Sequence, residues 1–109
     1  MLRATAWYMT RGAFLFQRLL RLDQLHDGLK ARFRLGRHEL LLVCVGTEVF
    51  ILDARCPHAG ADLGRGSLSG YQLRCPGHGQ TFDVRAGGRA GQPARYPVVY
   101  DGQWLGVEL

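Results

Sequence analysis

The sequence lacks any apolar run close to the roughly 20 residues that a membrane-spanning helix needs, so we expect no membrane span. Cysteine is also scarce: there are three, an odd number that does not suit the disulfide framework of a small secreted domain. Cysteines kept as thiols fit a reducing compartment, and we expect a cytoplasmic protein. The 109 residues, of which 47% are hydrophobic and 21% charged, suffice for one globular domain and argue against disorder.

Lysine is nearly absent, since Lys30 is the only lysine among 14 basic residues, and the acidic residues number 9. The resulting formal charge of +5 favours a partner with an acidic surface, because opposite potentials speed encounter. A solvated surface rich in arginine explains the same excess equally well. The arginines are scattered, and no basic helix or aromatic platform accompanies them, so we expect no nucleic-acid binding.

No acidic residue precedes Asp23, while residues 1–22 contain four arginines. A transit peptide or a weak signal peptide has a similar composition. Here, however, Arg11 and Arg18 interrupt the apolar part, and no long hydrophobic segment is present. We therefore interpret residues 1–12 as a short tail that precedes the first strand.

The sequence shows no convincing long helix and instead alternates short strand-like segments with turns, roughly every eight to twelve residues. Residues 30–35 alternate charged and apolar side chains, as expected for a half-exposed strand, and residues 38–45 form an apolar run typical of a buried one. This pattern predicts an all-β fold, an antiparallel β-sandwich or barrel. The further predicted strands begin at residue 13 and occupy residues 48–53, 71–74, 81–84, 95–100 and 103–109.

The character of the sequence changes between residues 54 and 91, which contain most of the 15 glycines and two of the cysteines. Loops this irregular must be held by something other than an apolar core. We therefore expect a small Gly-rich subdomain at about residues 54–91, inserted into a β-sheet base. Together they form a single domain over residues 13–109.

Two segments inside this insert pair a cysteine with a histidine. The first contains Cys56 and His58 in a C-x-H pattern, and the second contains Cys75 and His78 in a C-x-x-H pattern, with sixteen residues between His58 and Cys75. A single Zn²⁺ could use all four side chains tetrahedrally. A two-iron cluster could place both cysteines on one iron and both histidines on the other. The spacing alone does not choose between these two centres.

The surroundings of the four residues resemble the Rieske family closely. Residues 56–63 resemble the first cluster loop of that family, residues 75–83 its second loop, and residues 91–94 the third loop, which covers the cluster. The resemblance extends from about residue 22 to residue 109. It implies a Rieske fold and one [2Fe–2S] cluster, with the histidine ligands at an exposed tip. The implied metal and cofactor ligands are Cys56, His58, Cys75 and His78.

The chain departs from some members of the family at positions whose residues raise the reduction potential of the cluster in those members. Rieske proteins of quinol-oxidising complexes have two further cysteines that form a disulfide, but here Ala61 and Gly77 stand at those positions. They also have a Ser and a Tyr beside the cluster as hydrogen-bond donors, where this chain has Gln80 and Phe82. Fewer donors stabilise the reduced cluster less, so the resemblance implies a potential near the low end of the family's range of about −150 to +300 mV.

The remaining cysteine and histidines have no such partners in the sequence. Cys44 lies within an apolar run, and we interpret it as a buried core residue. His26 and His38 occupy polar surroundings, and we expect both to be exposed.

The resemblance to soluble Rieske ferredoxins implies an electron-transfer protein that is not itself an enzyme. It would carry single electrons between a flavin-dependent reductase and a terminal oxygenase or other redox protein. Partners would dock over the cluster tip, where four arginines lie nearby in sequence: Arg55, Arg65, Arg74 and Arg89. Two alternatives remain: a Rieske-like small subunit of a nitrite-reductase-type enzyme, which usually lacks the ligands, and a structural zinc-binding domain.

Overall fold

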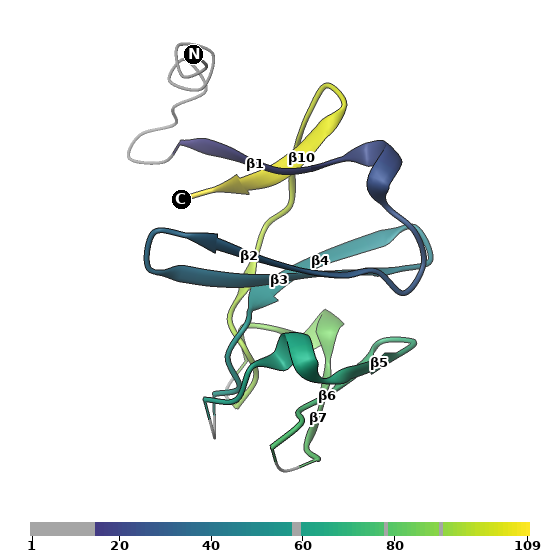
Figure 1. The fold of residues 1–109 in the computed structure, drawn as a ribbon, viewed down its shortest axis with the longest axis vertical. Coiled ribbons are helices and arrows are strands. Elements are labelled where there is room, and N and C mark those ends of the chain that lie inside the picture. The colour runs from purple at the N-terminus through teal and green to yellow at the C-terminus, as the bar shows by residue number, and fades with distance from the viewer. Residues whose placement is uncertain (1–14, 58–59, 78, 90) are drawn as a thin grey trace. The chain divides into compact units, whose positions relative to one another are not determined.

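The computed structural model describes residues 15–57, 60–77, 79–89 and 91–109 (Figure 1). Within these ranges the regular structure consists of ten β-strands and three single-turn 3-10 helices, and the strands form three antiparallel sheets. The predicted all-β class is therefore confirmed. The chain divides into two compact units, one formed by the residues up to 25 together with residues 97–109, and the other by residues 26–96.

The first unit contains a three-stranded sheet in the order β1-β10-β9. Its strands pair antiparallel, with an irregular register between Arg18 and Leu20 in β1. Phe16, Leu105 and Val107 supply its buried side chains. The bounds of the elements are Phe16–Arg21 for β1, Leu22–Gln24 for the 3-10 helix η1, Val99–Asp101 for β9 and Trp104–Glu108 for β10.

The second unit is built on a four-stranded sheet in the order β2-β3-β4-β8. Three of its strands coincide with the predicted segments, because β2 alternates charged and apolar residues and β3 and β4 contain the continuous apolar runs of buried strands. Tight turns at Gly36 and Gly46, with φ of 61° and 63°, join them into consecutive hairpins. The strands are β2 (Lys30–Leu35), β3 (His38–Val45), β4 (Glu48–Asp53) and β8 (Arg95–Tyr96).

A second, smaller sheet of this unit lies within the predicted Gly-rich insert and has the order β5-β6-β7 (Figure 1). Strands β6 and β7 lie within the segments predicted from the sequence, whereas β5 contains two serines and has no strand-like pattern. The bounds are Ser67–Ser69 for β5, Gln72–Arg74 for β6 and Thr81–Asp83 for β7, with the 3-10 helices η2 (Leu63–Arg65) and η3 (Val84–Ala86).

One apolar core joins the two sheets of the 26–96 unit. Alternate residues of β3 and β4 contribute Leu41, Val43, Phe50 and Leu52, since successive side chains of a strand point to opposite faces. The small sheet and its flanking helices contribute Leu63, Leu73, Phe82 and Val84 to this core. Its other members, Ala54, Cys56 and Cys75, lie in loops. The core thus contains two of the predicted ligands.

Among the residues that the structure describes, no helix is long and apolar enough to cross a membrane.

Candidate metal centre

The two predicted ligand loops share one backbone arrangement. In the first, the amide of Cys56 donates to the carbonyl of Ala61 at 2.8 Å, and the amide of Gly60 donates to the carbonyl of Cys56 at 2.8 Å. In the second, the amide of Cys75 donates to the carbonyl of Gln80 at 2.7 Å, and the amide of Gly79 donates to Cys75 at 3.0 Å. Each cysteine therefore begins a loop closed by the same two hydrogen bonds.

A glycine with positive φ is required near the end of each loop. Gly60 has a φ of 67° and Gly79 a φ of 69°, a conformation that is strained for residues with a Cβ atom. The two loops read Arg-Cys-Pro-His-Ala-Gly and Arg-Cys-Pro-Gly-His-Gly in the sequence. The shared Arg, Cys, Pro and Gly positions explain why both segments close in the same way.

The structure brings the two predicted sulfur ligands into one place. Cys56 and Cys75 are 2% and 1% exposed, and both belong to the core of the 26–96 unit. Ala61 from the first loop and Gly77 from the second line the same hollow, so the loops face each other. Two buried cysteines in one core, each at the start of a glycine-rich loop, fit an iron–sulfur cluster, because thiolate sulfur is its usual protein ligand.

The two predicted nitrogen ligands, His58 and His78, lie outside the described residues. Among the described residues there is no group of three or more His, Cys, Asp or Glu side chains arranged to hold a metal ion. The assignment of all four ligands therefore remains a prediction from the sequence.

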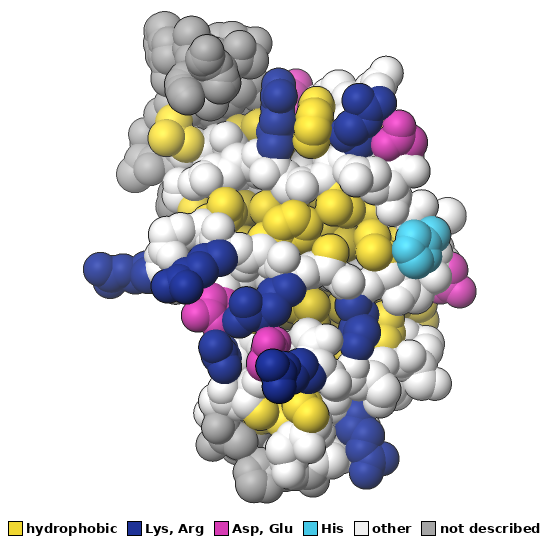
Figure 2. All heavy atoms as spheres, in the orientation of Figure 1, with side chains coloured by type: hydrophobic (Ala, Val, Ile, Leu, Met, Phe, Trp, Pro, Cys, Tyr) yellow, Lys and Arg dark blue, Asp and Glu magenta, His cyan; other side chains and the backbone are white. Residues whose placement is uncertain are grey.

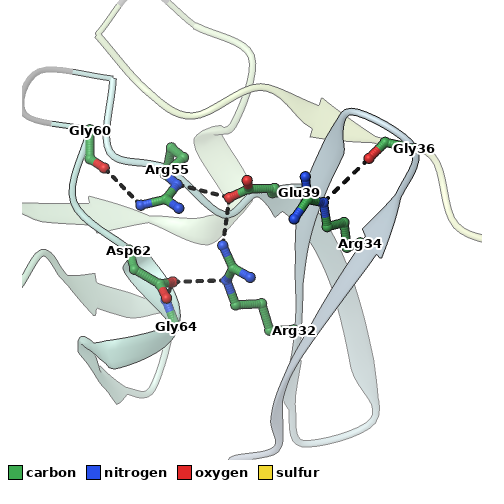
Figure 3. Close-up of polar contacts among 8 residues, drawn as sticks. All are labelled: Arg32, Arg34, Gly36, Glu39, Arg55, Gly60, Asp62 and Gly64. Carbon is green, nitrogen blue, oxygen red and sulfur yellow. Dashed lines mark hydrogen bonds and ion pairs between the residues drawn. The ribbon is translucent and has the colours of Figure 1, made fainter.

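The first loop is tied to the β2–β3 hairpin through Arg55 and Glu39 (Figure 3). The Arg55 Nε donates to the Glu39 carboxylate at 2.8 Å, and the Arg55 Nη1 donates to the carbonyl of Gly60 at 3.2 Å. Arg55 thus links the strand β3 to the end of the loop that Cys56 begins. The hydrogen bond from Arg55 also lowers the pKa of Glu39, which remains ionised.

Arg32 of β2 extends this network to the residues that follow the first loop (Figure 3). Its guanidinium donates to Glu39 at 2.5 Å and to Asp62 at 3.1 Å. The Asp62 carboxylate also accepts a hydrogen bond from the amide of Gly64 at 2.9 Å and so caps η2. Sequence reasoning missed Glu39 and Arg32, because both are distant in sequence from the loop that they hold.

A second polar group supports the small sheet beyond the second loop. Asp83 accepts hydrogen bonds from the backbone and side chain of Arg85, which lower the pKa of Asp83 to about 2. The Arg85 guanidinium also lies 3.9 Å from the centroid of the Tyr71 ring, and the Tyr71 hydroxyl donates to Glu48 of β4. These contacts connect the small sheet to the larger one.

The other cysteine and the two described histidines lie where the sequence predicted. Cys44 is 1% exposed, and burial raises the pKa of its thiol, with a further contribution from Asp27. His26 and His38 are exposed. None of the three joins the ligand loops.

A sequence profile described as the Rieske [2Fe–2S] domain matches residues 16–100. The chain belongs to this family. Membership of the Rieske family implies an iron–sulfur cluster and agrees with the resemblance drawn from the ligand motifs. The predicted Rieske fold is also confirmed: the structure is similar to the ferredoxin of carbazole 1,9a-dioxygenase from Nocardioides aromaticivorans. The TM-score is 0.74, with 31% sequence identity, over 84% of this chain and 95% of that one.

Curated relatives include both ferredoxin components and longer proteins. The ferredoxin component of the p-cumate 2,3-dioxygenase system of Pseudomonas putida is 36% identical over 78 residues, which are 70% of this chain and 66% of that protein. Human apoptosis-inducing factor 3 is 40% identical over 63 residues, but these are only 10% of its length. The matched part thus spans slightly less than two thirds of the first relative and a tenth of the second.

Proposed function

We propose that this chain is a Rieske-type ferredoxin that carries single electrons and catalyses no reaction of its own. One observation carries the proposal: Cys56 and Cys75 begin two loops of the same hydrogen-bonding pattern and are buried in one core. Family membership and the ferredoxin components among the relatives support it. Its single [2Fe–2S] cluster would be held by Cys56, His58, Cys75 and His78.

The cluster, when bound, supplies a couple that accepts and releases one electron. The chain's own residues determine how that couple is held. Cys56 and Cys75 would provide their thiolates from an apolar core that excludes water, and hydrophobic shells of this kind influence redox potential. The family implies that His58 and His78 lie at the exposed tip, which is the shortest route for an electron to a partner.

We assign the predicted partners and compartment to this function as part of the proposal. The electron donor would be a flavin-dependent reductase, and the acceptor a terminal oxygenase or another redox protein in the cytoplasm. The ferredoxin components of dioxygenase systems among the relatives support this assignment. The functional domain would comprise residues 13–109, with the cluster-binding part at about residues 54–91 and a tail at residues 1–12.

Absorption and EPR spectra of the purified protein test the proposal. We expect a red-brown protein that, after reduction, gives an EPR signal with a low average g value, as mixed Cys and His ligation requires. Cys75→Ala should abolish the colour and the signal. Cys44→Ala is the matched control and should keep both, because Cys44 is an equally buried thiol outside the loops. A colourless wild-type protein that contains zinc would instead establish the structural zinc domain.

A further inference from the structure

The 26–96 unit carries ten basic residues and six acidic residues. Each of the six carboxylates already accepts a hydrogen bond from a neighbour within the unit. The donors are Gly46 to Asp27, Arg32 and Arg55 to Glu39, Tyr71 to Glu48, Tyr96 to Asp53, Arg32 to Asp62, and Arg85 to Asp83. Of the ten basic residues, all of which the structure describes, only Arg32, Arg55 and Arg85 form ion pairs with these carboxylates, so the excess positive charge lies on the others.

The arginines near the two ligand loops fall into two groups. Arg32 and Arg55 form ion pairs with Glu39, and Arg32 also pairs with Asp62. In the part of the chain that the structure describes, no ion pair involves Arg65 or Arg74. The residues outside that part include no Asp or Glu, so they cannot provide a side-chain carboxylate.

Arg65 and Arg74 lie together beside the second ligand loop. Both line one hollow with Gly66, Ser67, Cys75, Pro76 and Gly79. The guanidinium of Arg74 lies against that loop, since a Cβ atom placed on Gly79 would be 2.9 Å from the Arg74 Nη2. Both arginines are exposed. On the face drawn in Figure 2, Lys and Arg side chains gather over this unit, with few acidic side chains among them.

We propose that Arg65 and Arg74 form a docking site for carboxylate side chains on an acidic protein partner. This inference rests on the proposed function, because the partner is the redox protein that exchanges an electron with this chain. A guanidinium binds a carboxylate through two parallel hydrogen bonds, which orients the partner as well as attracting it. The site lies beside Cys75, so a partner bound there is held next to the second ligand loop.

The structure gives Arg55 a different role from these two. The sequence placed these three arginines and Arg89 in one docking group. The structure pairs Arg55 with Glu39 and bonds it to Gly60. Its charge is compensated and its side chain holds the first loop. We therefore infer that the docking contribution of Arg55 is small.

Binding to a carboxylate-terminated alkanethiol monolayer on gold tests the docking site without an identified partner. Retention of the cluster-loaded protein is measured by surface plasmon resonance at increasing salt. The test variant is R65Q/R74Q. The matched control is R34Q/R37Q, which removes the same charge from two exposed arginines of the β2–β3 hairpin that line neither hollow.

We expect R65Q/R74Q to bind roughly tenfold more weakly than the wild type at low salt, because each exposed ion pair contributes modestly. R34Q/R37Q should bind nearly as well as the wild type. Equal weakening of both variants would show that only net charge matters and would overturn the proposal. Unchanged binding of R65Q/R74Q would also overturn it. Visible and circular dichroism spectra must match the wild type in both variants.

Voltammetry of the dissolved protein separates this inference from the proposed function. A one-electron response from the wild type, together with equal binding by the two variants, would remove the docking site and leave the ferredoxin function intact. The absence of any one-electron response would contradict the proposed function itself, and with it the docking proposal that rests on that function.

Discussion

At the scale of single residues, Glu39 holds the first ligand loop from a distant strand. We predict that Glu39→Gln speeds cluster loss several-fold, because it removes the carboxylate that accepts hydrogen bonds from Arg32 and Arg55. Bleaching of the visible absorbance in the presence of a chelator measures the rate. Asp27→Asn is the control, since it removes the same charge from a residue that accepts its hydrogen bond from Gly46, outside both ligand loops. Equal rates in the two variants would contradict the role given to Glu39.

Gly66 allows the chain to pass closely beside the small sheet. A Cβ atom there would lie 2.0 Å from the carbonyl oxygen of Arg74, so the backbone would have to move. We predict that Gly66→Ala lowers the free energy of unfolding by about 1–3 kcal/mol, as other overpacked sites do. Gly70→Ala serves as the comparison. A Cβ atom at position 70 would meet open space, so this substitution adds only the backbone strain of an alanine at a φ of 57°. Chemical denaturation of both variants should show the larger loss for Gly66→Ala.

Gln80 and Phe82 occupy the positions where high-potential Rieske proteins have hydrogen-bond donors. Phe82 is 1% exposed and its ring has no donor group. We predict a midpoint near the low end of the family's range of about −150 to +300 mV. Spectroelectrochemical titration of the purified protein measures it. A midpoint well above zero would show that other groups supply the missing donors.

At the scale of elements, the short strand β8 is held to β4 by a side-chain contact as well as by backbone pairing. The Tyr96 hydroxyl donates to the Asp53 carboxylate at 2.7 Å, and burial together with this hydrogen bond raises the pKa of Tyr96 to about 12. An unfolded tyrosine titrates near pH 10. The fold therefore binds the phenolic proton more tightly, and the stability gained is complete below about pH 10 and lost as the pH rises toward 12.

This linkage predicts the behaviour of Tyr96→Phe at high pH. The difference in free energy of unfolding between the wild type and Tyr96→Phe should shrink between about pH 10 and 12. Ultraviolet difference spectra of the wild type should contain a phenol component that titrates near pH 12 and is missing from the variant. If the lost component titrates near pH 10 instead, the hydrogen bond to Asp53 does not protect the proton.

The strands show which elements a sequence pattern can identify. Strands β2, β3 and β4 were predicted with their observed bounds, because alternating or continuous apolar residues extend over at least six positions. Strand β5 has three residues and two serines, and it exists through antiparallel pairing with β6. Its polar residues contain no pattern that would predict it.

At the scale of the whole molecule, the larger sheet and the ligand loops differ in what holds them. Leu40–Val43 of β3 are fully buried and paired on both sides, whereas each described ligand loop has two closing backbone hydrogen bonds. We predict that removing the cluster exposes the amides that close the two loops, those of Cys56, Gly60, Cys75 and Gly79, to hydrogen exchange while β3 stays protected. Exchange followed by mass spectrometry, before and after chelation, measures this. Loss of protection in β3 at the same rate would show that the whole unit depends on the metal.

The sequence by itself indicated a centre held by cysteine and histidine, and it predicted most of the β-strands. Cysteines and histidines at fixed offsets carry their chemistry in the residue types, and strand periodicity is a local property of the chain, so both can be recognised without a structure. Only the tertiary structure decided what each arginine does. Arg55, Arg65 and Arg74 look alike in the sequence, but folding brings Glu39 into an ion pair with Arg55. Among the described residues, no acidic side chain forms an ion pair with Arg65 or Arg74. The compensation of one charge by another depends on the distance between them in the folded protein, and this distance cannot be read from their separation along the sequence.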